Sequence, residues 1–267
     1  MRMKRATTRL GRAWRRATAR SRRALAAWRR WPPAARVFAV AVAFASMAVT
    51  YQVLRKPAEL FALAPAASKS PAATWAAYGP LFREHATDVV GPELLAALAQ
   101  AESAGDPLAR TFWRWRWSWD PLDVYAPASS AVGLLQMTDA TFAEARHLCV
   151  HDHRAAREGR WHDLHACWFN ALYVRWRPGD AIEMTSAWLD QQVRAAAGAR
   201  LEKTTPDQRR RLAAVIHLCG AHRGAAFARR GFRVHARERC GDHRVADYLA
   251  RVGRLADEFG RLARQAG

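Results

Sequence analysis

The first 58 residues of this 267-residue chain contain no acidic side chain, although they contain fifteen lysines and arginines. These fifteen account for three quarters of the formal net charge of +20. The remaining 209 residues carry 28 basic and 23 acidic side chains and are therefore nearly neutral. A charge of this size usually indicates a nucleic-acid-binding protein. Because the charge is concentrated in the N-terminal tail, we expect no nucleic-acid partner for the rest of the chain.

The sequence also lacks repeats of fixed period, and it contains only one long uncharged stretch. These absences exclude a repeat protein and a protein with many membrane spans. Apolar residues make up 51% of the chain, which excludes global disorder and is enough for a full hydrophobic core. We therefore expect one folded domain, or at most two, outside the tail.

The uncharged stretch runs from Val37 to Leu54. As an α-helix it would be roughly 27 Å long, close to the roughly 30 Å hydrocarbon core of a bilayer. It predicts a transmembrane helix over residues 37–54, with a buried core helix and a cleaved signal peptide as alternatives. Because Arg55, Lys56 and Pro57 follow the stretch directly, an uncleaved anchor is preferred.

Thirteen basic residues precede this stretch, and only two follow it closely. The positive-inside rule therefore predicts a cytoplasmic tail over residues 1–36 and a location of the remaining chain outside the cytoplasm. In a bacterium this means a single-pass inner-membrane protein with a periplasmic domain. Within the tail, apolar residues recur every three or four positions, which is typical of an amphipathic helix on anionic lipid. A disordered basic leader that only sets the topology is the alternative.

Residues 55–74 are rich in alanine, proline and serine and predict a linker. From residue 75 to residue 267 the apolar spacing is helical, which predicts an all-α domain. The expected helix starts are Pro92, Thr138, Asp180, Thr205 and Asp242, and the helix after Thr138 is expected to include Leu148. Strict alternation is present only at Trp113, Trp115, Trp117 and Trp119, which predicts one strand.

All four cysteines lie after the predicted anchor, so an oxidising compartment would favour disulfides. Of the three possible connectivities, we prefer the pairs of sequence neighbours, Cys149–Cys167 and Cys219–Cys240. The alternative is a structural metal site, because histidines and aspartates surround the first pair. Their spacing matches no strong zinc pattern, so we predict no metal site.

Glu102 is the strongest candidate for a catalytic residue. It follows Leu95 and Leu98 by seven and four positions, so the three side chains share one face of a helix. A carboxyl group at the end of an apolar stripe is partly removed from water, which suits a general acid. An exposed glutamate without a function is the alternative.

The residues around Glu102 resemble the soluble lytic transglycosylase family, whose fold is related to goose-type lysozyme. The resemblance covers roughly residues 85–230 and rests on three segments: Glu102-Ser103, Gly133-Leu134-Leu135-Gln136-Met137 before Thr138, and Ile182 to Leu189. It implies a lysozyme-like helical domain in which Glu102 is the catalytic acid. It also implies that Ser103, Gly133, Leu134, Gln136 and Met137 lie beside the sugar, and that no cofactor is needed.

The sequence departs from the family in one motif. The family has an Ala-Tyr-Asn-Ala-Gly segment whose tyrosine contacts the catalytic glutamate, whereas this chain has His217-Leu218-Cys219-Gly220-Ala221. His217 or a tyrosine such as Tyr125 is expected to take that role. The tryptophans are expected either to pack on the helices or, as Trp115 and Trp117, to line a glycan groove.

The resemblance implies a substrate, the peptidoglycan glycan strand, and cleavage between N-acetylmuramic acid and N-acetylglucosamine with a 1,6-anhydro product. Two alternatives remain open. Asp106, Asp120 or Asp123 could activate water, which would make the protein a hydrolytic lysozyme. Without the tyrosine–asparagine motif, the domain could instead be a degenerate glycan-binding or scaffold protein of the same fold.

Overall fold

The computed structural model describes residues 28–55, 67–110, 113–115, 125–127, 129–159, 167–168 and 170–266. The chain divides into two units, Met1–Pro57 and Ala58–Gly267. Each unit is described by itself.

The first unit contains one long helix, α2 (Pro33–Arg55), which includes the whole uncharged stretch. Val37, Phe38, Phe44 and Met47 on this helix are exposed. Over the residues that the structure describes, no helix is both long and apolar enough to cross a membrane. The anchor over residues 37–54 therefore stays a prediction, and the amphipathic helix proposed before Trp28 lies outside the described residues.

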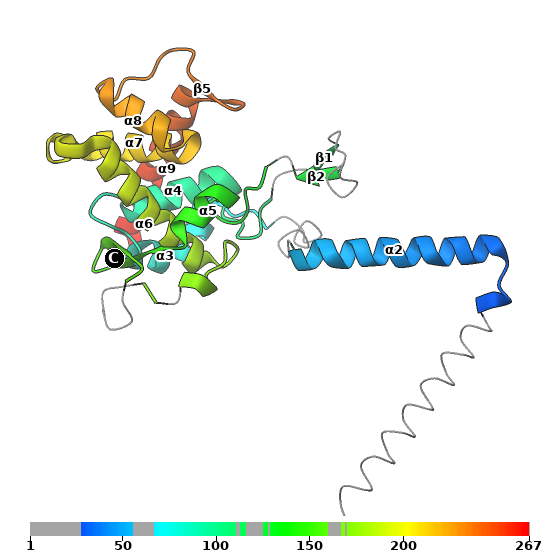
Figure 1. The fold of residues 1–267 in the computed structure, drawn as a ribbon. Helices are drawn as coiled ribbons and strands as arrows, with labels where there is room; N and C mark the ends of the chain where they lie inside the picture. The colour runs from blue at the N-terminus through cyan, green and yellow to red at the C-terminus, as the bar shows by residue number, and fades with distance from the viewer. Residues whose placement is uncertain are drawn as a thin grey trace, which may run out of the picture. The chain divides into compact units, whose positions relative to one another are not determined.

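The second unit is mostly helical, which confirms the predicted all-α class (Figure 1). Helix α4 is central to its core, because every residue from Leu94 to Gln100 is buried. Helices α3 and α9 pack against α4, and α7 and α8 pack against α6. The helices are α3 (Pro71–Glu84), α4 (Pro92–Ser103), α5 (Asp139–Ala145), α6 (Pro178–Ala197), α7 (Pro206–Cys219), α8 (Ala221–Arg229), α9 (Val245–Ala266) and the 3₁₀ turns Asn170–Leu172 and Gly198–Lys203.

Three of the predicted helix starts are confirmed. Pro92 is the first residue of α4, where its missing N–H costs no hydrogen bond. The Thr138 hydroxyl accepts a hydrogen bond from the backbone N–H of Thr141 and caps α5. Thr205 and Gln208 form a capping box at the start of α7. These starts depend on neighbours in sequence, which is why they can be predicted locally.

Two predicted starts are wrong. Helix α6 begins at Pro178, and the buried Asp180 accepts a hydrogen bond from the backbone N–H of Val174 at 3.0 Å. Asp180 therefore holds the preceding loop against the helix instead of capping it. Asp242 lies in the turn between strands β5 (Arg239–Cys240) and β6 (His243–Arg244), and α9 begins directly after β6.

A short hairpin replaces the expected end of the helix that follows Thr138. Helix α5 ends at Ala145, and Leu148 lies in strand β3 (Leu148–His151), which pairs antiparallel with β4 (Arg154–Arg157). The two residues between the strands, Asp152 and His153, both have positive φ angles. This backbone suits a two-residue hairpin turn, but the residues that usually mark such a turn in a sequence are glycine and asparagine. The hairpin was therefore missed from sequence.

The tryptophan-rich segment does form a strand, β1 (Trp113–Trp115). It pairs antiparallel with β2 (Tyr125–Pro127), and Trp115 lies opposite Tyr125. Trp117 and Trp119 lie outside the described residues.

The helical unit includes more of the N-terminal segment than predicted. The backbone N–H of Ala67 donates to the Asp106 carboxylate at 3.0 Å, and that of Lys69 donates to the Ala104 carbonyl oxygen at 2.7 Å. Ser70 then caps α3. Residues 67–74 are thus fastened to the end of α4, whereas the linker was expected to continue through residue 74.

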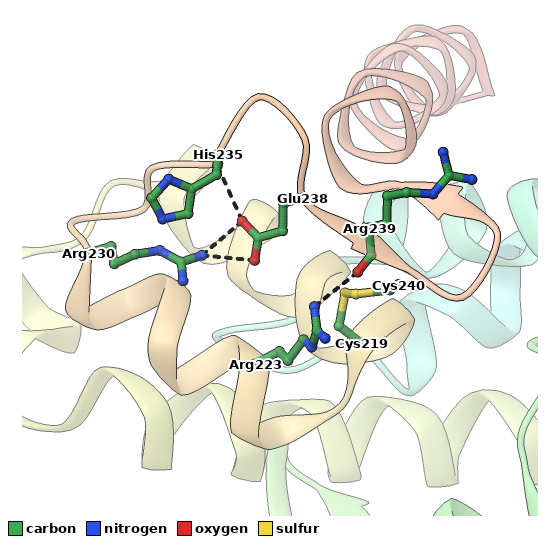
Figure 2. Close-up of a disulfide and its surroundings, with 7 residues drawn as sticks. All are labelled: Cys219, Arg223, Arg230, His235, Glu238, Arg239 and Cys240. Carbon is green, nitrogen blue, oxygen red and sulfur yellow. Dashed lines mark hydrogen bonds and ion pairs between the residues drawn. A yellow bond between two sulfur atoms is a disulfide. The ribbon is translucent and has the colours of Figure 1, made fainter.

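Both disulfides join the predicted sequence neighbours. Cys149 in β3 is bonded to Cys167, and Cys219 at the end of α7 is bonded to Cys240 in β5 (Figure 2). Beside the second disulfide, Arg223 donates to the Arg239 carbonyl oxygen, and Arg230 donates to both Glu238 carboxylate oxygens at 2.9 Å (Figure 2). Because all four cysteines are oxidised, none offers a thiolate to a metal ion.

Candidate functional site

Glu102 is the penultimate residue of α4, a helix in which every residue from Leu94 to Gln100 is buried. Its side chain is 20% exposed. The helix ends at Ser103 because Ala104 and Gly105, which follow it, both adopt positive φ angles. A Cβ atom on Gly105 would lie 2.2 Å from the Thr74 hydroxyl oxygen, so only glycine fits this turn. The end of α4 is therefore held in one conformation, with the Glu102 carboxylate partly open to solvent.

Tyr248 is the direct partner of this carboxylate. Its hydroxyl donates a hydrogen bond to Glu102 Oε1 at 2.6 Å. Tyr248 lies near the start of α9 and is 7% exposed. Burial raises the pKa of Tyr248 well above its ordinary value, and the charge of Glu102 raises that pKa further. The phenol therefore remains a protonated donor throughout the physiological range.

His217 is the second neighbour of Glu102. Its Nε2 atom lies 3.8 Å from Glu102 Oε1, which is too long for a hydrogen bond. Burial lowers the pKa of His217 below its ordinary value, although the Glu102 charge and a hydrogen bond to the Leu135 backbone oppose that shift. His217 is therefore neutral at pH 7, and Glu102 faces one polar donor and one neutral ring.

The loop that precedes Thr138, residues 132–137, is hydrogen-bonded to the end of α4. Ser103 Oγ lies 2.7 Å from the Leu134 carbonyl oxygen and 2.9 Å from that of Ala99, so its single proton can go to either. Gln136 has a φ angle of 46°, and its side-chain amide donates to the carbonyl oxygens of Ala109 and Gly133, both at 2.9 Å. Ser103 and Gln136 thus shape the loop next to Glu102.

Arg175 holds both ends of the same loop. Its guanidinium donates to the carbonyl oxygens of Ser130 and Met137 at 2.9 Å, and it pairs with Asp139 at 2.7 Å. Gly133 has a φ angle of 85°, and a Cβ atom there would lie 2.2 Å from the Arg175 carbonyl oxygen. The resemblance implies that Gly133 lies beside the sugar. In the structure, its missing side chain makes room for the Arg175 backbone.

The other predicted contact residues are placed differently. The side chains of Leu134 and Met137 are 0% and 3% exposed and belong to the hydrophobic core. Any contact of these two residues with a sugar would have to come from their backbone. Trp115 and Tyr125 lie opposite each other in the β1–β2 hairpin. Trp117 is not among the described residues.

Asp106 is occupied by backbone contacts. One of its carboxylate oxygens accepts from Ala67 N–H at 3.0 Å and the other from Leu108 N–H at 2.9 Å. It is 7% exposed. Asp106 therefore stabilises the turn after α4, and its position does not suit activation of a water molecule. Asp120 and Asp123 lie outside the described residues.

Tyr248 was missed as a functional residue from the sequence. It follows Glu102 by 146 residues and belongs to the apolar stripe of the last helix. Its single hydroxyl within that stripe is the only signal that the sequence offers. His217, which was expected to replace the absent tyrosine, does lie near Glu102, whereas the hydroxyl that bonds the carboxylate belongs to α9.

The structure contains pockets away from the carboxylate itself. Three pockets, of about 630, 530 and 400 Å³, are formed by α4, α7 and α9 with neighbouring segments. Glu102 lines none of these three. The second includes Gln100 of α4 and Ala104, the residue that follows α4.

The lowered pKa of His217 predicts a pH-dependent stability. Below about pH 6.5 the unfolded chain takes up a proton at this histidine before the folded chain does, so the free energy of unfolding should fall as pH decreases. The slope from this group is at most about 1.4 kcal/mol per pH unit. His217→Gln should flatten the decline between pH 7 and pH 5, measured by urea unfolding. His222→Gln, at an exposed histidine, is the control, and an equal effect of both would contradict the prediction.

Comparison with known proteins adds no family assignment: no protein-family model matches the chain, and no curated protein matches it.

Proposed function

We propose that this protein is a membrane-anchored lytic transglycosylase that cleaves peptidoglycan glycan strands, with Glu102 as the general acid and base. The observation that carries the proposal is the 2.6 Å hydrogen bond from Tyr248 to Glu102, with His217 beside it. The resemblance calls for a tyrosine on the catalytic glutamate. Tyr248 meets that requirement from a different helix.

The contact with Tyr248 orients the proton transfer. Because Tyr248 occupies Oε1, the other carboxyl oxygen is the one available to a substrate. From there a protonated Glu102 would donate to the glycosidic oxygen as the bond to muramic acid C1 breaks. The resulting carboxylate would then take the proton of the muramoyl C6 hydroxyl, whose oxygen attacks C1 and forms the 1,6-anhydro ring. One carboxyl group performs both steps, so no second acid is required.

The proposed location follows from the remaining sequence signals. The N-terminal tail and the uncharged stretch within α2 would anchor the protein in the inner membrane. The helical unit would then lie in the periplasm, where an oxidising environment suits the two disulfides.

The products of digestion test the proposal directly. Purified full-length protein in detergent would be incubated with sacculi, and the released fragments would be analysed by mass spectrometry. We expect fragments that end in 1,6-anhydromuramic acid. Reducing ends would indicate a hydrolytic lysozyme instead, and the absence of soluble fragments would indicate a non-catalytic glycan-binding protein.

Tyr248→Phe should lower turnover by about 10- to 100-fold while the fold is kept. The change removes one hydroxyl and leaves Glu102 Oε1 without its donor, so the carboxyl group loses both orientation and charge stabilisation. Initial rates of fragment release would be compared with those of Tyr78→Phe. Tyr78 is a half-buried tyrosine of α3 whose hydroxyl has no hydrogen bond among the described residues. Equal rates for the two variants would refute a role for Tyr248.

A further inference from the structure

Positive charge is concentrated in residues 221–244, which run from α8 through the β5–β6 hairpin. These residues include seven arginines and only two acidic side chains. Residues 67–199, by contrast, contain twelve basic and fifteen acidic side chains. The charge of the helical unit is therefore unevenly distributed, and the proposed chemistry uses no residue of this basic segment.

Most of the seven arginines have no carboxylate partner. Arg230 donates to the Glu238 carboxylate, and Arg244 lies 3.6 Å from the Asp247 carboxylate, so these two charges are balanced locally. The carboxylate of Asp242 is the only other one in the segment. We call the remaining five arginines the arginine surface. All five are exposed, and none has a carboxylate partner in the described chain: Arg223, Arg229, Arg233, Arg237 and Arg239.

The arginine surface belongs to a well-fixed part of the fold. The Arg223 guanidinium of α8 donates to the Arg239 carbonyl oxygen of β5 at 2.9 Å, which joins the helix to the hairpin (Figure 2). The disulfide between Cys219 and Cys240 joins the same hairpin to the end of α7. The inner face of α8 is buried through Phe227 and packs on α6 and α7. The arginines are therefore presented by a folded surface.

This surface offers charge without apolar anchors. The two phenylalanines of the segment, Phe227 and Phe232, are only 1% and 9% exposed. Val234, the largest aliphatic side chain of the segment, is half-buried. Stable protein–protein interfaces usually depend on large apolar or aromatic side chains at their centre. The chemistry that fits these residues is instead an extended anionic surface.

The predicted membrane anchor would place such a surface within reach. Eleven residues, 56–66, separate the end of α2 at Arg55 from Ala67 in the helical unit. Fully extended, this connection spans at most about 40 Å. A short connection gives a high effective concentration, so a weak attraction to the bilayer is sufficient. Each arginine close to an anionic bilayer strengthens that attraction by about five-fold.

We propose that the arginine surface docks on the anionic phospholipid headgroups of the bilayer in which the protein is anchored. Guanidinium groups bind phosphate oxygens with two parallel hydrogen bonds. Docking holds the helical unit at the bilayer and restricts the orientations that the tethered unit adopts. This inference rests on the proposed function for the membrane anchor alone, since it uses neither Glu102 nor a glycan substrate.

A fluorescent probe next to the arginines tests the docking. The probe is attached to Ala236→Cys, at an exposed position, in full-length protein without reductant, because the native cysteines are all paired. The protein is reconstituted in phosphatidylcholine vesicles with or without phosphatidylglycerol. Quenching by a nitroxide on the lipid headgroup, which acts only at short range, is then measured. We expect phosphatidylglycerol to increase quenching about 3-fold, and high salt to abolish the increase.

Two triple variants with the same change in net charge identify the surface. The test variant removes three arginines that have no partner in the described chain: Arg229→Gln, Arg233→Gln and Arg237→Gln. The control removes three exposed arginines of α9: Arg251→Gln, Arg254→Gln and Arg261→Gln. The test variant should lose the response to phosphatidylglycerol, and the control should keep it. Equal quenching of the wild-type probe in both lipids overturns the inference, as does an equal loss in both variants.

The anchor is measured separately, by the resistance of full-length protein to extraction from the membrane at alkaline pH. If the protein resists extraction but the probe ignores phosphatidylglycerol, the docking is overturned and the anchor stands. If the protein is extracted, it is added to preformed vesicles. Arginine-dependent quenching on anionic vesicles then supports the docking although the anchor fails, and its absence overturns both.

Nucleic acid is the other anionic partner that the experiment separates. Binding of duplex DNA that depends on Arg229, Arg233 and Arg237, without any response of the probe to phosphatidylglycerol, assigns the surface to nucleic acid and overturns the docking. None of these outcomes depends on whether the protein cleaves glycan, so failure of the enzymatic proposal is observed independently.

Discussion

Replacement of Glu102 by glutamine is expected to lower the rate of glycan cleavage by about 10³-fold or more. Glutamine keeps the shape of the side chain and can still accept the hydrogen bond from Tyr248. It cannot donate or take up the proton that both proposed steps require. Because the same group serves as acid and as base, its loss should affect the two steps together.

The matched control for this variant is Glu93→Gln, on the first turn of the same helix. It changes the same residue type and the same charge at the opposite end of α4. Release of anhydromuramoyl fragments from sacculi would be measured for both variants and for wild type. Retention of more than a tenth of wild-type activity by Glu102→Gln would show that another group is the catalytic acid.

Gly133→Ala is expected to have the largest effect on stability, about 3 to 5 kcal/mol. Part of this loss comes from the positive φ angle of 85°, which costs a side chain roughly 1 to 2 kcal/mol. The remainder comes from the new Cβ atom, which would lie 2.2 Å from the Arg175 carbonyl oxygen. The neighbouring atoms belong to the backbone of Arg175 and Pro107. The clash can therefore be relieved only if the loop that borders Glu102 moves.

Gly220→Ala separates these two contributions. Gly220 has nearly the same φ angle, 83°, but a Cβ atom there would meet nothing within 4 Å. It should therefore lose about 1 to 3 kcal/mol from the backbone conformation alone, because a φ of 83° with a ψ of 166° is a region that residues with a side chain rarely adopt. Urea unfolding of both variants would give the two free energies. Equal losses at the two positions would mean that the approach of Arg175 is unimportant for stability.

Under the proposed function, the contact from Tyr248 would replace the tyrosine of the motif that this chain lacks. The tyrosine hydroxyl at the carboxylate comes from α9, which packs along α4, and α7 presents a neutral histidine at the position where the motif was expected. A hydroxyl can support the same oxygen atom from any neighbouring helix that reaches it. The position of the tyrosine in the chain therefore matters less than its contact.

Much of the architecture was determined by short-range features of the sequence. Pro92, Thr138 and Thr205 mark true helix starts because proline geometry and capping hydrogen bonds involve residues within a few positions. The pairing of neighbouring cysteines and the all-α class were likewise predictable. Glu102 could be singled out because it ends an apolar helical stripe, a pattern that periodicity makes visible.

Other features were decided only by the tertiary structure. The contact between Tyr248 and Glu102 joins residues 146 positions apart, and it exists because the apolar stripe of α9 packs on α4. The need for glycine at position 133 depends on the backbone of Arg175, which another part of the chain brings within reach. Local propensity contains no information about such distant neighbours. The sequence thus identified Glu102 as the candidate acid, whereas the packing of α9 on α4 determines that Tyr248 is the residue hydrogen-bonded to it.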